Sequence, residues 1–202
     1  MMLFLIRHGE TEWNKQKRRQ GRRDVPLNED GRAQMRRCGE LLSSLSVDAI
    51  LTSPLSRAVE SAEILSEHLG FEKNDIRREP GFIERDFGDI DGMTQAELRA
   101  YRARGGNQEH IEPLYQVRSR MMQAILQVAR QKKHRHVLIV SHSAAIKSVF
   151  ARLYGKPELQ RKATRNAGVS IIEYKGGRLH PRAFNLDPEE AARYLRRHHL
   201  ME

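Results

Sequence analysis

The residues best suited to chemistry stand near the amino end, in the string Arg7-His8-Gly9-Glu10-Thr11. They follow residues 2–6, an apolar run with the length of a buried strand. Open α/β sheets bind ligands beyond the carboxyl ends of their strands, so we expect Arg7 and His8 to face a ligand. Glycine at position 9 would let the backbone approach that ligand closely. Residues 10–14 are typical of a helical turn whose free N–H groups face an anion.

Polar residues follow two further apolar runs in the same way. Ser53 comes after the strand expected at residues 48–51, and His142 comes after the strand expected at residues 136–140. Ser53 is predicted to cap the next helix, with Pro54 at its first position. Arg57 then falls in the first turn of that helix. These side chains can therefore converge with His8 at one sheet edge, although more than a hundred residues of chain separate them.

Two arginines and two imidazoles would repel one another unless an anion joined them, and planar guanidinium groups match phosphoryl oxygens. A neutral imidazole can attack phosphorus and form a phosphohistidine that water later cleaves. Arg7, Arg57, Asn14 and His142 could hold the oxygens of the transition state. Glu84 is the candidate acid for the leaving group, because burial would tend to keep it protonated. We expect neither a metal nor another cofactor.

Strand patterns alternate with helix patterns along the chain. Helices are predicted after the N-cap Asn28, after Pro54 as far as Gly70, over residues 94–104, over residues 114–128, after His142 and over residues 188–198. Residues 169–174 and 178–184 are predicted to form a hairpin. This order indicates a three-layer α/β/α sandwich with a mostly parallel central sheet and a hairpin added late. We expect residues 1–202 to form a single domain.

The chain is basic, with 36 Lys and Arg against 26 Asp and Glu and a formal net charge of +10. Such a charge attracts phosphorylated metabolites, nucleic acids and acidic membranes alike. Aromatic residues make up 6% and no recognition motif interleaves them with basic residues, so nucleic acid is not an expected partner. Basic residues 15–23 favour substrates with additional negative charge. Other basic pairs, including Lys132-Lys133, are expected to lie on the solvated surface of the protein.

Cys38 is the one cysteine, which excludes an internal disulfide. It falls on the apolar face of a predicted helix and is expected to fill the core. The apolar run at residues 2–6 is too short for a signal peptide, and no run is long enough to span a membrane. We therefore expect a cytoplasmic protein; both a monomer and a dimer stay open.

The string Arg-His-Gly-Glu-Thr-x-Trp-Asn at residues 7–14 resembles the signature of the histidine phosphatase family, also called phosphoglycerate mutase-like. The resemblance implies that His8 is the nucleophile. Arg7, the Arg57 of Ser-Pro-x-x-Arg-Ala, and His142 would bind the phosphoryl group. Glu84, in a Glu-x-x-Phe-Gly segment, would be the proton donor.

The resemblance extends to residues that contact or border the phosphate. Asn14 and Ser53 match such family positions, Gln20-Gly21 matches the substrate loop, and Ser143 beside His142 is expected to join them. The chain departs from the family pattern in three places: Ser143-Ala144-Ala145 stand where glycine is common, Lys147 where arginine is frequent, and Asp91 where glutamate is usual. These departures bear on substrate choice more than on activity.

The leading hypothesis is therefore metal-independent hydrolysis of a small phosphorylated metabolite. Phosphoryl transfer of the phosphoglycerate mutase type is one alternative, but mutases of the family tend to have larger insertions after the glutamate segment, which exclude water. A non-catalytic module that binds a phosphorylated ligand is the other. The intact His8 and Glu84 argue against that module.

Overall fold

Six strands form one sheet in the computed structural model, which describes residues 1–131 and 134–201; Lys132-Lys133 lies outside the described residues. The strand order is β3-β2-β4-β1-β5-β6. β1 to β4 run parallel, and the hairpin of β5 and β6 adds two antiparallel strands beside β1. The strands are β1 (Met2–Arg7), β2 (Ala49–Thr52), β3 (Arg77–Arg78), β4 (His136–Ser141), β5 (Val169–Lys175) and β6 (Arg178–Leu186).

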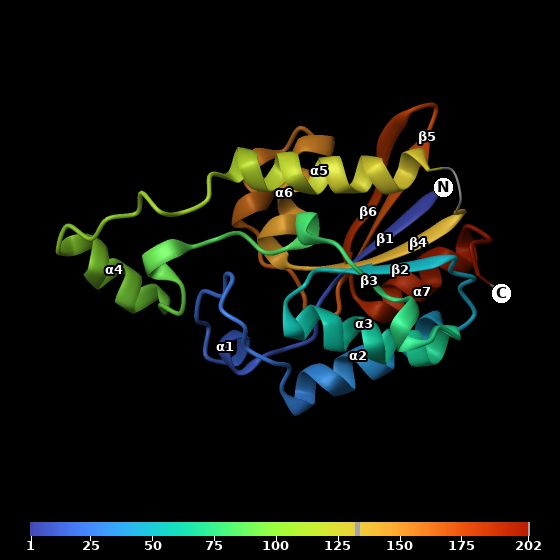
Figure 1. The fold of residues 1–202 in the computed structure, drawn as a ribbon, viewed down its shortest axis with the longest axis horizontal. Coiled ribbons are helices and arrows are strands. Elements are labelled where there is room, and N and C mark those ends of the chain that lie inside the picture. The colour runs from blue at the N-terminus through green and yellow to red at the C-terminus, as the bar shows by residue number, and fades with distance from the viewer. Residues whose placement is uncertain (132–133, 202) are drawn as a thin grey trace.

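Helices cover both faces of this sheet, so the predicted three-layer α/β fold is confirmed (Figure 1). The helices are α1 (Glu12–Lys15), α2 (Glu29–Leu42), α3 (Ser56–Leu69), α4 (Gln95–Ala103), α5 (Leu114–Arg130), α6 (Ser143–Leu153) and α7 (Pro188–Arg197). In Figure 1, α2, α3 and α7 lie on one side of the sheet and α5 and α6 on the other, while α4 stands apart at one end.

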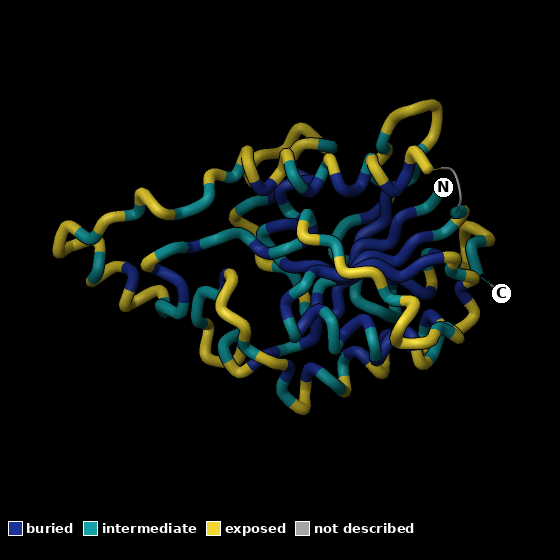
Figure 2. Tube along the Cα trace, in the orientation of Figure 1, coloured by how far each residue is buried: buried dark blue, intermediate teal, exposed yellow. Residues whose placement is uncertain are grey.

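The two layers of core follow from the alternation of side chains along β1. Phe4 and Ile6 point to the cluster that includes α2, α3 and α7, whereas Leu3 and Leu5 point to the cluster that includes α5 and α6. All four side chains have no exposed surface. Figure 2 shows the resulting buried centre beneath exposed helix faces and loops. A strand that is buried on both faces needs a continuous apolar run, as residues 2–6 provide.

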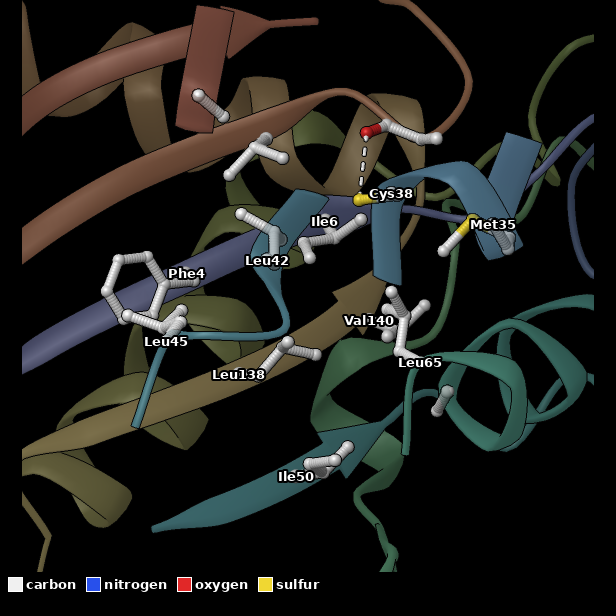
Figure 3. Packing of buried hydrophobic residues seen from close by; sticks show 14 of the residues in the cluster. Phe4, Ile6, Met35, Cys38, Leu42, Leu45, Ile50, Leu65, Leu138 and Val140 are labelled. Carbon is white, nitrogen blue, oxygen red and sulfur yellow. Dashed lines mark hydrogen bonds between the residues drawn. The ribbon is translucent and has the colours of Figure 1, made fainter. Parts of the chain in front are cut away.

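Cys38 lies in the first of these clusters, between α2 and the sheet (Figure 3). Its thiol is fully buried, and burial raises the pKa of Cys38 to about 12. The predicted role as core filler is confirmed, because such a thiol stays protonated and unreactive.

One local prediction near the strand ends was wrong. α3 begins at Ser56, with Leu55 as its N-cap, so Ser53 does not cap the helix and Pro54 precedes it. The close approach of Gly9 to a ligand stays a prediction, and the structure adds a packing reason for glycine: a Cβ atom there would lie 2.4 Å from the carbonyl oxygen of Gly31 in α2. Glycine is required at position 9 because the backbone of α2 passes against it.

Within residues 1–131 and 134–201, no helix combines the length and apolar composition needed to cross a membrane.

Candidate active site

Strand register brings the candidate residues together. Arg7, the last residue of β1, pairs with Ser141, the last residue of β4, so His8 and His142 are the next residues along two neighbouring parallel strands. The two imidazole rings lie 5.1 Å apart between centroids, at an interplanar angle of 57°. β2 ends beside β4, and the N–H of Ser53 donates to Val140. The predicted convergence at one sheet edge is therefore present.

His8 is held in one tautomer by the backbone. Its Nδ1 lies 2.6 Å from the carbonyl oxygen of Gly9, and that oxygen can only accept a hydrogen bond. Nδ1 must therefore carry the proton, and in the neutral ring Nε2 keeps its lone pair. The side chain is 3% exposed. Burial first, and then the charges of Arg57 and Arg7, lower the pKa of His8 well below its usual range, which favours the neutral form.

His142 is fully buried and is fixed from the other side by Ser53. The Nε2 of His142 lies 2.7 Å from the Ser53 hydroxyl oxygen, which also accepts a hydrogen bond from the N–H of Leu55. Burial, followed by the charge of Arg57, lowers the pKa of His142 well below its usual range. Ser53 thus positions an imidazole rather than a helix end.

These two histidines make stability depend on pH. Below about pH 6.5 the unfolded chain protonates both rings while the folded protein keeps them neutral, so stability is lost as the pH falls through that value. We expect the free energy of unfolding to be about 2 kcal/mol lower near pH 5.5 than near pH 7.5, as measured by urea titration. The double variant H8N/H142N should lose most of this dependence. A wild-type profile that is flat over this interval would contradict the assignment.

Arg7 and Arg57 face the site with buried guanidinium groups. Burial is the main cause that lowers the pKa of each to about 10, still charged at neutral pH. Arg57 has no exposed surface, so it is not a solvated charge on the surface of α3. It donates to the carbonyl oxygens of Gly21 at 2.7 Å and Arg23 at 3.0 Å, and Arg7 donates to that of Thr164 at 2.6 Å.

Unpartnered nitrogens gather at this edge. Among the described residues, five buried side-chain nitrogens lack a hydrogen-bond partner: Nε of Arg7, Arg19 and Arg57, Nε2 of Gln20 and Nδ1 of His142. Four of these five residues were predicted for the site from the sequence. Leaving buried donors unpaired is costly, so donors gathered in one place indicate a site for an acceptor such as a phosphoryl oxygen.

Glu84 lies at the amino end of α6 and is 4% exposed. Its Oε1 accepts from the N–H groups of Arg85 at 2.8 Å and Ala145 at 3.0 Å, and its Oε2 accepts from Ala144 at 3.0 Å. The last two are orphan donors of the first turn of α6. The sequence suggested burial alone, whereas the structure adds three backbone donors that orient the carboxyl group.

Arg120 of α5 fixes the segment that carries Glu84, and sequence reasoning missed it. Its guanidinium donates to the carbonyl oxygens of Gly81 at 3.0 Å, Ile83 at 2.5 Å and Glu84 at 3.0 Å. It also pairs with Glu112 through Nε and the second terminal nitrogen. No local pattern predicts this contact, because the partners are separated by 36 to 39 residues.

We expect Arg120→Met to destabilise the protein by about 3 kcal/mol, because three carbonyl groups lose a donor and the half-buried Glu112 loses one of its two arginine partners. Urea unfolding measures this change. Arg118→Met is the matched control on the same helix, since Arg118 is exposed, and should change stability by less than about 0.5 kcal/mol. Equal effects of the two substitutions would contradict the proposed clamp.

The loop with Gln20 and Gly21 is held from two sides. The Asp91 carboxylate accepts from the N–H groups of Gly21 at 2.7 Å and Arg23 at 3.2 Å, while Arg57 takes the carbonyl groups of the same two residues. The N–H of Gly21 is therefore not free for a phosphate. The Gln20 Oε1 accepts from Asn14 at 3.2 Å, which leaves its amide nitrogen unpartnered.

The helical turn at residues 10–14 differs from the prediction. The N–H groups of Glu10, Thr11 and Asn14 are taken by the side chains of Gln34, Asn14 and Thr11, so they do not face an anion. Thr11 and Asn14 form a capping box at the amino end of α1. Asn14 also accepts from Asn166 at 3.0 Å, a residue that the sequence did not indicate.

Ser143, the first residue of α6, is connected to the site by a chain of contacts. Its hydroxyl accepts from the Thr164 hydroxyl at 2.7 Å, and the Thr164 carbonyl accepts from Arg7. Asn166 donates to the carbonyl of His8 at 3.1 Å. Thr164 and Asn166 lie in irregular chain between α6 and β5, where no periodicity reveals a function.

A cleft of about 540 Å³ opens beside Arg7 and Asn14. Its other lining residues are Lys17, Arg18, Arg19, Met93, Gln95, Lys147, Arg161, Lys162, Ala163 and Asn166. A larger groove of about 850 Å³ lies along α5, but none of the predicted site residues lines it. We therefore assign the cleft beside Arg7 and Asn14, and not the groove along α5, to the candidate active site. Within the described part of the chain, no group of three or more His, Cys, Asp and Glu could hold a metal ion.

Residues 3–187 match the model of the histidine phosphatase superfamily, branch 1. The chain belongs to this superfamily. It is an enzyme of the phosphatase class, as several of its relatives are by name. An uncharacterized phosphatase of Bacillus subtilis, PhoE, is 38% identical over 184 residues, which cover 91% of this chain and 93% of the relative.

Two further superfamily members are similar over most of the chain. A probable phosphoglycerate mutase of Salmonella choleraesuis, GpmB, is 30% identical over 187 residues, which cover 87% of this chain and 86% of the relative. The solved structure of YhfR from Bacillus stearothermophilus has a TM-score of 0.82 at 30% identity and covers 92% of this chain and 96% of its own. The resemblance in residues 7–14 thus extends to the whole fold.

Proposed function

We propose that this histidine phosphatase hydrolyses phosphomonoesters through a phosphohistidine on Nε2 of His8. The observation that carries the proposal is the bond from Nδ1 of His8 to the Gly9 carbonyl, which leaves a neutral ring with its lone pair on Nε2. The low pKa of His8 supports the same role, because a protonated imidazole cannot attack phosphorus.

In the first step, Nε2 of His8 forms a bond to phosphorus as the bond to the leaving oxygen breaks. Arg7, Arg57 and the Nδ1 side of His142 stabilise the charge on the equatorial oxygens, since their unpartnered nitrogens are available as donors. Ser53 supports this role of His142 if its hydroxyl donates to Nε2, which leaves the proton on Nδ1.

Glu84 is the proposed acid. Its Oε2 accepts one of the three backbone hydrogen bonds and Oε1 accepts two, so Oε2 has room for the proton that passes to the leaving alkoxide. In the second step water attacks phosphorus, the nitrogen–phosphorus bond breaks, and the Glu84 carboxylate takes a proton from the water. The imidazole of His8 and the carboxylic acid are both restored.

The two arginines supply the positive charge that the transition state needs, so we propose that hydrolysis is independent of metal ions. Asn14, Gln20 and Ser143 would complete the surroundings of the phosphoryl group, and Gly21 would hold the loop between Arg57 and Asp91. The expected result is phosphate release from p-nitrophenyl phosphate with a chelator present. Loss of activity on chelation, with recovery on adding a divalent cation, would contradict the proposal.

Phosphoryl transfer of the mutase type is the second candidate function, because one relative is named as a probable phosphoglycerate mutase. The two reactions are separated by incubating the enzyme with 3-phosphoglycerate. A phosphatase releases inorganic phosphate and glycerate, whereas a mutase forms the isomeric phosphoglycerate without net release. We expect phosphate release.

A further inference from the structure

The walls of the cleft beside Arg7 are strongly cationic. Seven of its twelve lining residues are Lys or Arg and none is Asp or Glu: Arg7, Lys17, Arg18, Arg19, Lys147, Arg161 and Lys162. They come from β1, from the basic loop after α1, from α6 and from the segment before β5. The sequence indicated the loop at residues 15–23 and singled out Lys147 of α6, but not the contribution of residues 161–162.

Few of these charges are neutralised by the protein itself. Arg18 pairs with Glu97 at 3.0 Å, and the other six form no ion pair with a carboxylate of the described chain. By contrast, Arg22 of the basic loop pairs with Glu112 and Asp86 and does not line the cleft. The uncompensated charge is therefore concentrated at the mouth of the site.

Lys147 holds part of this charge in place. Its ammonium group donates to the carbonyl oxygens of Gln160 and Lys162, each at 3.0 Å, and Arg7 donates to Thr164. These bonds fasten residues 160–164 beside the catalytic edge of the sheet, with the exposed side chain of Arg161 among them. Burial is the main cause that lowers the pKa of Lys147. The charge of Glu84 opposes this shift, whereas the charges of Arg7 and Arg19 add to it, so these three cations repel one another.

We propose that the cleft binds a second phosphoryl group of the same substrate, so that the preferred substrates are small molecules carrying two phosphoryl groups. The inference rests on the proposed function, in which one phosphoryl group occupies Arg7 and Arg57. That group leaves Lys17, Arg19, Lys147, Arg161 and Lys162 without an ion-pair partner among the described residues. A second doubly charged group relieves their repulsion, whereas a neutral substrate tail does not. A volume of about 540 Å³ is sufficient for a small ligand.

The test compares three ligands of equal chain length: an alkylphosphonate, an alkyl phosphonocarboxylate and an alkylene diphosphonate. Calorimetry measures their binding to the full-length protein at physiological salt, where long-range attraction is screened. We expect the diphosphonate to bind about tenfold more tightly than the alkylphosphonate. Equal affinity of these two would overturn the subsite. A phosphonocarboxylate that binds as tightly as the diphosphonate would overturn its assignment to a phosphoryl group.

The variant R161E/K162E reverses two charges of the proposed subsite, and the expected ratio of the two affinities falls to about one. The control K175E/R178E changes net charge equally in the exposed turn of the β5–β6 hairpin, beyond the amino end of β1, and should keep the wild-type ratio. If the control lowers the ratio as much, the preference arises from net charge and the subsite is wrong.

The binding and hydrolysis measurements test the subsite and the proposed reaction separately. Wild-type protein that shows the diphosphonate preference but releases no phosphate from p-nitrophenyl phosphate would retain the subsite and contradict the proposed reaction. Wild-type protein that hydrolyses p-nitrophenyl phosphate but binds all three ligands alike would retain the reaction and contradict the subsite.

Discussion

Replacing His8 by alanine is expected to lower kcat for p-nitrophenyl phosphate by about 10⁴-fold or more, because the reaction loses its nucleophile. The remaining groups cannot form the covalent intermediate, and direct attack by water has no positioned base on that side of phosphorus. Phosphate release at saturating substrate is the measurement. An effect below about tenfold would show that His8 is not the nucleophile.

The folded site should survive this substitution, and that is the control. Arg7, Arg57 and His142 are anchored by contacts that do not include the His8 ring, so H8A should still bind phosphate or vanadate. His180→Ala is the matched variant, since His180 is exposed on β6, and should keep wild-type kcat. Trapping of radioactive phosphate on the wild-type chain, but not on H8A, would identify the intermediate directly.

The second large effect is expected from Glu84→Gln, and it should depend on the leaving group. An alkoxide is a poor leaving group and needs a proton, so kcat for an alkyl phosphate should fall by about 10²- to 10⁴-fold. The p-nitrophenolate ion leaves without protonation. Hydrolysis of p-nitrophenyl phosphate should therefore fall much less.

Comparing two substrates on one variant separates chemistry from folding. The glutamine cannot accept the N–H of Ala144 through its amide nitrogen, so E84Q is expected to lose some stability as well. Partial unfolding would lower both rates by the same factor. Equal losses for the two substrates would therefore contradict the role of Glu84 as the proton donor.

Glu84 shows which features of the site can be predicted from local sequence and which cannot. Its burial was expected from the sequence and its segment was recognised from the Glu-x-x-Phe-Gly motif, which is a local feature, and the structure buries Glu84 as expected. The bonds that orient it come from Arg120 on α5 and from the amino end of α6, which are 36 and 60 residues away. Such contacts depend on how helices pack, and periodicity carries no information about that.

The helix start after β2 illustrates a competing interaction. Ser53-Pro54 is a common beginning for a helix, and local propensity alone favours that reading. In the folded protein the hydroxyl of Ser53 lies against His142, and α3 begins at Ser56. The Ser53 hydroxyl therefore forms a tertiary hydrogen bond with a buried imidazole, whereas local propensity had predicted that it would cap the helix.

The sequence by itself determined the order of the main strands and helices, the superfamily motif and the four residues Arg7, His8, Arg57 and His142. It could do so because burial imposes periodicity on apolar residues, and because parallel strands must end at one edge. Tertiary structure alone decided the tautomer of His8, the partners of Ser53 and Glu84, and the cationic cleft that Lys147 and residues 161–162 complete. Those features arise from contacts between segments whose separation in the chain leaves no local pattern.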